Sequence, residues 1–80
     1  MAEVPLVVPD LGEQIARVRV VEWHKQLHAT VALDELVVAV STEKIDVDLG
    51  SPTGGTLTEI RVEVGEWAAV GATLAIISDG

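Results

Sequence analysis

Residues 36–49 read Leu-Val-Val-Ala-Val-Ser-Thr-Glu-Lys-Ile-Asp-Val-Asp-Leu. Two apolar runs rich in β-branched residues, 36–40 and 45–49, flank a short polar segment at 41–44. Neither run has the period of a helix, and two such runs around a polar break are typical of paired strands. The stretch therefore predicts a β-hairpin with Lys44 at or beside the apex of its tight turn.

The rest of the chain shows the same alternation of strand-like runs and breaks. Many short strands at regular spacing, separated by turn residues, are typical of a β-sandwich or a flattened β-barrel, so the predicted fold class is all-β. The other apolar runs lie at residues 4–8, 18–23, 57–64 and 74–77, and the Gly-, Pro- and Asp-containing breaks at 9–12, 50–55, 65–66 and 70–72.

The chain also contains an internal repeat. A shift of 37 residues superimposes apolar positions on apolar positions at nearly every step, which is better than the chance alternation of an ordinary β protein. Two similar halves, each with one apolar face, can bury those faces only against each other, so we expect an approximate two-fold axis. The matched positions are Trp23 with Ile60, Leu27 with Val64, residues 31–33 with 68–70, and residues 37–41 with 74–78.

The composition restricts the size and the chemistry of the protein. The 80 residues are expected to form one domain, residues 1–80, and a chain this short buries only about 60% of its unfolded surface. A deep catalytic cleft is therefore not expected. Phe, Tyr and Cys are absent, so the core should consist of Val, Leu, Ile and Ala around Trp23, with no disulfide and no thiolate nucleophile.

The formal net charge of −8 limits the classes of partner. It repels phosphate backbones and anionic membrane surfaces, so we expect no nucleic-acid or membrane partner and favour basic protein surfaces. The first residues contain no charged leader followed by an apolar run, and no stretch is long enough to span a bilayer. The chain is expected to stay where it is made, and a transit peptide removed upstream would leave no trace in it.

The two lysines, Lys25 and Lys44, have different surroundings. Lys25 lies just before a turn, whereas Lys44 is flanked by the acidic residues Glu43, Asp46 and Asp48. A turn lysine beside acids is usually only a solvated charge. The position of Lys44 on the predicted hairpin, together with the repeat and the neighbouring motifs, favours a functional role instead.

Over essentially its whole length the chain resembles the lipoyl domains of the acyltransferase components of 2-oxo acid dehydrogenase complexes, which are related to biotinyl carrier domains. Residues 40–45, Val-Ser-Thr-Glu-Lys-Ile, are similar to the modification hairpin of that family, usually written Glu-Thr-Asp-Lys-Ala or Ser-Thr-Asp-Lys-Val. The other matching segments are Val8-Pro9-Asp10-Leu11-Gly12-Glu13, Ser51-Pro52, Gly54-Gly55-Thr56-Leu57, Val64-Gly65-Glu66 and Val70-Gly71.

The resemblance implies a flattened sandwich or barrel of two four-stranded sheets and a carrier domain without an active site of its own. Lys44 would receive lipoate through an amide bond to its side-chain nitrogen, and Glu43 and Ile45 would contribute to recognition. The implied partners are a thiamine-dependent 2-oxo acid decarboxylase, the acyltransferase catalytic core, dihydrolipoamide dehydrogenase and a lipoate ligase or lipoyl transferase. The implied location is the bacterial cytoplasm or the mitochondrial matrix, and the isolated domain would be a monomer.

The sequence departs from this family pattern at several positions. His28-Ala29 stands where the family commonly has Gly-Asp, although a turn that needs a positive φ accepts histidine poorly. We favour a different turn geometry there over a strained turn, which would cost about 1 kcal/mol. Glu43 replaces the more frequent aspartate, and Gly50 stands where a proline is common. Several departures together would also fit a laboratory variant on a lipoyl scaffold.

Trp67 and the two histidines need separate interpretations. The repeat aligns Trp67 with Thr30, which is expected on a turn, so Trp67 is either a half-exposed contact residue or an aromatic lid over the core edge. His24 and His28 are four residues apart but lie on strand and turn rather than on a helix. They are expected to be surface residues and not metal ligands.

Two alternative functions follow from the same fold. A biotin carrier also modifies a hairpin lysine, but its site resembles Ala-Met-Lys-Met, whereas Lys44 has Glu43 and Ile45 beside it. An unmodified lipoyl-like module with a structural or adaptor role would not need a lysine at the turn. An enzyme is disfavoured because no nucleophile with a paired base, no phosphate loop and no metal cluster can be assembled from the sequence.

Overall fold

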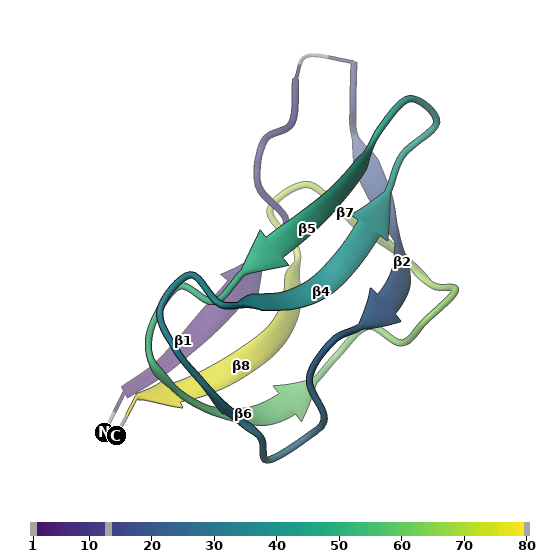
Figure 1. Ribbon diagram of the computed structural model, residues 1–80. Helices are drawn as coiled ribbons and strands as arrows, with labels where there is room; N and C mark the ends of the chain where they lie inside the picture. Colours follow the sequence, from purple (N-terminus) through teal and green to yellow (C-terminus); the bar gives the residue numbers. More distant parts are fainter. Residues whose placement is uncertain (1, 13, 80) are drawn as a thin grey trace.

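A computed structural model describes residues 2–12 and 14–79, in which eight strands form two four-stranded sheets (Figure 1). The sheet orders are β1-β8-β6-β3 and β5-β4-β2-β7, and all neighbouring strands are antiparallel. The predicted all-β fold is confirmed, in the form of a flattened sandwich of two separate sheets. The strands are β1 (Ala2–Val7), β2 (Arg17–Trp23), β3 (Thr30–Val31), β4 (Leu36–Ser41), β5 (Asp46–Gly50), β6 (Gly55–Ile60), β7 (Trp67–Ala69) and β8 (Thr73–Asp79).

Six of these strands correspond to the apolar runs of the sequence, and two do not. β3 and β7 contain only two and three residues, too few to show the alternation from which a strand is predicted. Thr30 was therefore expected on a turn but belongs to β3. The run at residues 57–64 is also corrected, because β6 begins at Gly55 and ends at Ile60.

The internal repeat is present in the hydrogen bonds as well as in the sequence. A shift of 37 residues carries β2, β3 and β4 onto β6, β7 and β8, while β1 and β5 take the same edge position in opposite sheets. The His28 N–H donates to the Leu57 carbonyl at 2.6 Å, and the Gly65 N–H donates to the Val20 carbonyl at 2.8 Å. His28 is the repeat mate of Gly65, and Leu57 is the repeat mate of Val20. The same hydrogen bond therefore forms once in each direction, which confirms the predicted quasi-two-fold relation.

The core is aliphatic, as the composition predicts, but Trp23 is not at its centre. Trp23 is partly buried and packs against the core from the side, where its indole N–H donates to the Val62 carbonyl at 3.0 Å. Since this bond satisfies the indole nitrogen, the ring can pack against the core without burying an unpaired donor. The core residues are Leu6, Val8, Val18, Val20, Val31, Val37, Val38, Val40, Leu49, Leu57, Ala68, Leu74, Ala75 and Ile77.

The turn at His28 keeps the left-handed geometry, so the different turn that we favoured is wrong. His28 has φ 73° and its repeat mate Gly65 has φ 92°. The same holds at the next turn, where Asp34 has φ 66° and its mate Gly71 has φ 89°. Equivalent hydrogen bonds in the two halves determine the backbone conformation of each turn. The first half adopts this left-handed conformation without glycine.

Replacing His28 by glycine should therefore stabilise the domain. A non-glycine residue in the left-handed conformation costs the folded state about 1–2 kcal/mol. Glycine also gives the unfolded chain more conformational entropy, which offsets about 0.5–1 kcal/mol of this. We therefore expect the free energy of unfolding to rise by about 0.5–1 kcal/mol. Urea denaturation measures the gain. His28→Ala is the matched control, because it removes the imidazole but keeps the Cβ atom. An equal gain in both variants would show that the imidazole and not the backbone is unfavourable.

Two glycines lie where the backbone of another segment comes too close for a side chain. A Cβ atom at Gly50 would lie 2.8 Å from the carbonyl oxygen of Asp34, in the turn before β4. A Cβ atom at Gly55 would lie 2.0 Å from the Ser78 carbonyl oxygen. Both contacts are with backbone atoms, which cannot turn aside as a flexible side chain can.

Gly55→Ala should consequently destabilise the domain by about 3 kcal/mol or more, because the β6–β8 pair must separate to admit the methyl group. The adjacent Gly54→Ala is the control, since the nearest atom to its Cβ would be 3.7 Å away. Thermal unfolding of the two variants followed by circular dichroism should show a large decrease in Tm only for Gly55→Ala. Similar decreases would contradict the close approach.

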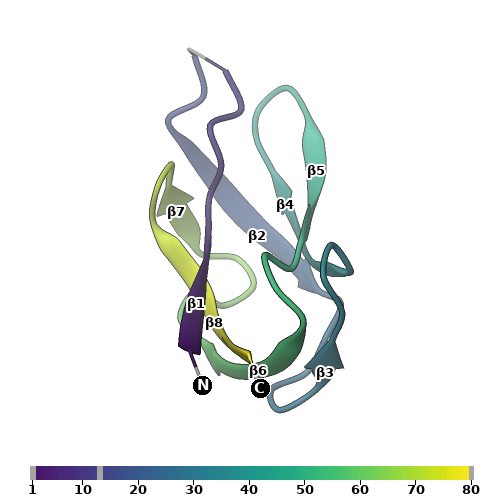
Figure 2. The ribbon, with the colours of Figure 1, turned by 90° about the vertical axis from the view of Figure 1, so that its left-hand side faces the viewer.

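The β4–β5 hairpin and the chain ends lie at opposite ends of the molecule (Figure 2). Ala2 pairs with Asp79, and the Ala2 N–H donates to the Asp79 carboxylate at 2.9 Å. At the hairpin end, the Gly12 N–H donates to the Asp10 carboxylate at 3.0 Å in the loop that follows β1. Glu13, the last residue of the predicted opening motif, lies outside the described residues. Among the described residues no helix has the length and apolar character needed to cross a membrane.

Candidate functional site

The hairpin places Lys44 at its tip, as predicted. Ser41 of β4 pairs with Asp46 of β5, and the four residues between them, 42–45, make the turn. Lys44 is exposed, as are Glu43 and Ile45 on either side of it. We call β4, β5 and this turn the lysine hairpin.

The Thr42 side chain holds the turn in place. Its hydroxyl oxygen accepts hydrogen bonds from the backbone N–H groups of Lys44, at 3.1 Å, and Ile45, at 3.0 Å. The Thr42 N–H in turn donates to the Ile45 carbonyl at 2.8 Å. A hydroxyl that bonds backbone groups two and three residues ahead is the threonine form of a side-chain turn. The backbone of Lys44 is thereby fixed while its side chain is left to solvent.

The two lysines differ in their contacts. Lys25 forms an ion pair with Glu35, and its hydrogen bond, followed by that of the Ala32 N–H at 2.8 Å, lowers the pKa of the Glu35 carboxyl. Within residues 2–12 and 14–79, no ion pair is formed by Lys44. Lys25 is thus part of the ion-paired structure, whereas Lys44 is exposed at the tip of the hairpin.

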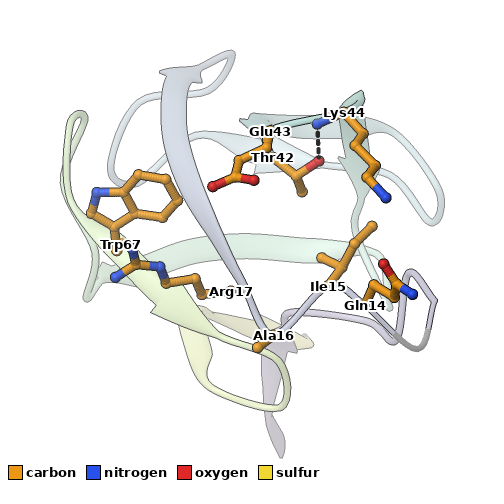
Figure 3. A pocket seen from close by; sticks show the side chains of 8 residues that line it. All are labelled: Gln14, Ile15, Ala16, Arg17, Thr42, Glu43, Lys44 and Trp67. Carbon is orange, nitrogen blue, oxygen red and sulfur yellow. Dashed lines mark hydrogen bonds between the residues drawn. The ribbon is translucent and has the colours of Figure 1, made fainter.

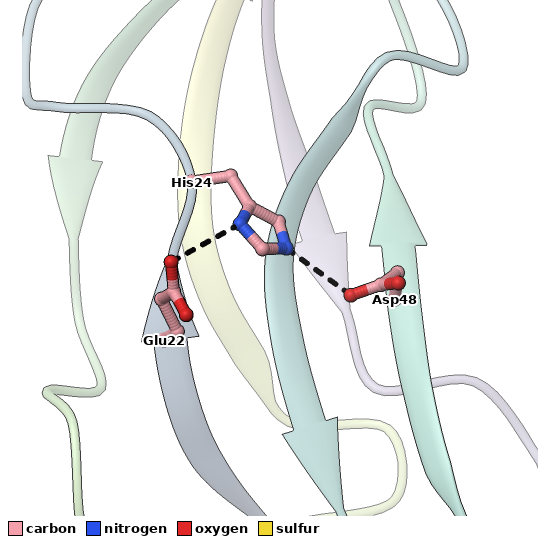
Figure 4. A network of polar contacts seen from close by, with 3 residues as sticks. All are labelled: Glu22, His24 and Asp48. Carbon is pink, nitrogen blue, oxygen red and sulfur yellow. Dashed lines mark hydrogen bonds and ion pairs between the residues drawn. The ribbon is translucent and has the colours of Figure 1, made fainter.

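One of the acids near Lys44 is engaged elsewhere. Asp48 accepts a hydrogen bond from His24 Nε2 at 3.1 Å, and His24 Nδ1 lies 3.7 Å from the Glu22 carboxylate (Figure 4). This contact links the end of β2 to β5 across β4. Among the described residues no group of three or more His, Cys, Asp or Glu side chains is arranged to hold a metal ion.

A groove of about 190 Å³ lies beside Lys44 (Figure 3). We call it the hairpin groove; its walls are residues 14–17, residues 42–44 and Trp67. Trp67 is 47% exposed, and the Arg17 guanidinium lies 4.3 Å from the centroid of its ring. Because Ala68 is buried, its neighbour Trp67 points away from the core, so the aromatic lid is wrong and the half-exposed position is confirmed.

The sequence did not predict that residues 14–17 would meet the lysine hairpin. These residues precede and begin β2, and only the packing of the second sheet brings them beside Thr42 and Lys44. The sequence shows only a polar loop that carries the apolar residues Ile15 and Ala16. Such a loop does not indicate which segment it will contact. Chemically, the site offers a primary amine at a fixed point in solvent next to a small, partly apolar groove.

Comparison with known proteins assigns the family. A family model described as biotin-requiring enzyme, of the biotin and lipoyl group, matches residues 4–77. The chain is 38% identical over 72 residues to the dihydrolipoyllysine-residue acetyltransferase component of the pyruvate dehydrogenase complex of Corynebacterium glutamicum. It is 34% identical over 77 residues to the dihydrolipoyllysine-residue succinyltransferase component of the 2-oxoglutarate dehydrogenase complex of Rickettsia conorii.

These matches cover 90% and 96% of this chain but only 11% and 20% of the two relatives. The solved lipoyl domain of the 2-oxoglutarate dehydrogenase complex from Azotobacter vinelandii has a TM-score of 0.78 and 28% identity, with 96% of this chain and 98% of that domain covered. The chain belongs to the biotin and lipoyl domain family. Its fold is that of a lipoyl domain, a carrier module that is not itself catalytic.

Thr42→Val should loosen the turn, because two backbone N–H groups lose their acceptor. We expect a loss of about 1 kcal/mol in the free energy of unfolding and faster amide exchange at Lys44 and Ile45. Thr42→Ser keeps the hydroxyl and should exchange like the unmutated domain. Denaturant unfolding and NMR amide exchange make the comparison. Equal exchange in the Val and Ser variants would show that the hydroxyl does not hold the turn.

Proposed function

We propose that this domain carries lipoate, amide-linked to Nζ of Lys44, as the swinging arm of a 2-oxo acid dehydrogenase complex. The observation that carries the proposal is the exposed lysine at the apex of a tight turn in a lipoyl-domain fold. The lipoyl-bearing relatives support it. A biotin carrier is less well supported, since the flanking residues are Glu43 and Ile45 rather than methionines.

The residues around Lys44 fit such a group. Its amine is in solvent, where a ligase can reach it, and the groove beside it accepts a small partly apolar group. When attached, lipoate supplies a dithiolane that takes up and hands on an acyl group and two electrons. The chain itself needs no acid or base for this, because it presents the arm and leaves the chemistry to other active sites.

The structure of the lysine hairpin suits this presentation. β4 and β5 are paired from Leu36 with Gly50 to Ser41 with Asp46, so the base of the arm is anchored by a ladder of hydrogen bonds. Covalent attachment at a fixed tip raises the local concentration of the arm at each active site within its reach. The lysine must stand clear of the sandwich for this, and the tip of a hairpin provides that clearance.

The expected partners follow from the same proposal. They are a thiamine-dependent 2-oxo acid decarboxylase that loads the arm, the acyltransferase core that unloads it, dihydrolipoamide dehydrogenase that reoxidises it, and a lipoate ligase or lipoyl transferase. With a net charge of −8 the domain would meet basic surfaces on them. The bacterial cytoplasm or the mitochondrial matrix would be its compartment, and the domain alone would be a monomer.

Replacing each lysine in turn tests the attachment site. After incubation with lipoate ligase, ATP and lipoate, intact mass should show one lipoyl group on the unmutated domain and on Lys25→Gln, and none on Lys44→Gln. Lys25 is the matched control because it is the only other lysine and is ion-paired with Glu35. A lipoyl group on Lys44→Gln would contradict the assignment. Incubation with a biotin ligase should give no streptavidin signal with any of the three.

Exchanging neighbours tests the position of the amine on the turn. In the double variant Glu43→Lys, Lys44→Glu the charge and composition are unchanged, but the amine starts one residue earlier. We expect its rate of lipoylation to fall by about a hundredfold, the order seen when a reacting group is misplaced. Circular dichroism should show an unchanged fold. Lipoylation at the normal rate would mean that the ligase does not require this geometry.

A further inference from the structure

The hairpin groove begins at the proposed attachment point itself. Lys44 forms part of its wall, and in Figure 3 the Lys44 side chain extends toward Ile15 and Gln14. Any group joined to Nζ therefore starts at the mouth of the groove. Ile15 and Ala16 give one side an apolar surface, and Trp67 closes the far end beside Arg17.

Trp67 lies within reach of the lysine hairpin. Arg19 of β2 pairs with Trp67 on one side and with Ser41 on the other, so Trp67 shares a row with the residue that precedes the turn. Two strand spacings separate them, which is about 10 Å. The Arg17 guanidinium lies 4.3 Å from the centroid of the indole, and Trp67 is still 47% exposed.

The repeat shows that the fold does not need an aromatic residue at this position. The repeat mate of Trp67 is Thr30, in β3 of the other sheet. Thr30 pairs with β6 as Trp67 pairs with β2, so the two have equivalent backbone surroundings. A threonine is sufficient for the fold at the equivalent position, which lies at the end of the molecule away from Lys44. A large exposed indole therefore stands only at the end that carries the lysine.

We propose that the hairpin groove is a binding site for the dithiolane ring of this domain's own arm, which rests against Trp67 between transfers. This rests on the proposed lipoylation of Lys44. The ring is small and apolar, and its sulfur atoms make favourable contacts with an aromatic edge. Such contacts give a preference of roughly two- to tenfold for the docked arm, weak enough for partner enzymes to draw the arm out.

The test uses the 80-residue domain, lipoylated on Lys44 and verified by intact mass. Nuclear Overhauser effects between the dithiolane protons and the Trp67 indole are expected in the oxidised domain. Reduction of the dithiolane by a water-soluble phosphine should be slower by roughly two- to tenfold than in a variant that lacks the indole, matching the docked preference. An octanoylated domain, which has a similar chain but no sulfur, shows how much of the contact is due to the ring.

The repeat supplies the matched variant, Thr30→Trp with Trp67→Thr. It keeps the composition and moves the indole to the equivalent position at the other end. Loss of the slow reduction in this variant, with the Overhauser effects present in the unmutated domain, supports the site. A lipoylated, unmutated domain without these effects overturns it, even if the double variant does not fold. An unmodified Lys44 would instead contradict the proposed function, and intact mass distinguishes the two failures.

Discussion

The structure depends on the burial of two apolar sheet faces against each other. Each half of the chain contributes buried residues at matching steps of the repeat: Val20 with Leu57, Val37 with Leu74, and Val40 with Ile77 are all at most 1% exposed. Neither sheet can remove its apolar face from water alone, because a single four-stranded sheet of this size has nothing else to cover it. The two-fold relation is therefore a consequence of packing as much as of sequence similarity.

This packing explains at which positions the chain tolerates a strained backbone and at which it needs glycine. His28 and Asp34 adopt positive φ because their turns form hydrogen bonds equivalent to those of the glycine-containing turns in the second half, and the packing of the core compensates for the strain. Gly50 and Gly55 are needed for a different reason, the close approach of the backbone of another segment. The lysine hairpin extends beyond the core and depends on local contacts instead, above all those of the Thr42 hydroxyl. The tightly packed core and the exposed tip of the lysine hairpin thus lie in different parts of the molecule.

That separation suits a carrier domain. The turn residues 43–45 are all exposed, so the proposed attachment of lipoate to Lys44 would not disturb the core. Lys25, by contrast, is bound to Glu35 and belongs to the structural part. The one feature at the tip that neither the turn nor the core requires is the hairpin groove with Trp67. Its place beside Lys44 is the basis of the resting site proposed for the arm.

The sequence by itself determined the six longer strands, the repeat, the aliphatic core and the hairpin with Lys44 at its turn, because alternation, turn residues, repeat spacing and composition are all properties of the sequence alone. Only the tertiary structure decided the rest. β3 and β7 are too short to have a period and exist because β6 and β2 offer them edges. The φ of His28 is imposed by Leu57, and the groove joins residues 14–17 to Thr42 and Trp67. Contacts between segments that are distant in the sequence arise from packing, and no local sequence pattern predicts them.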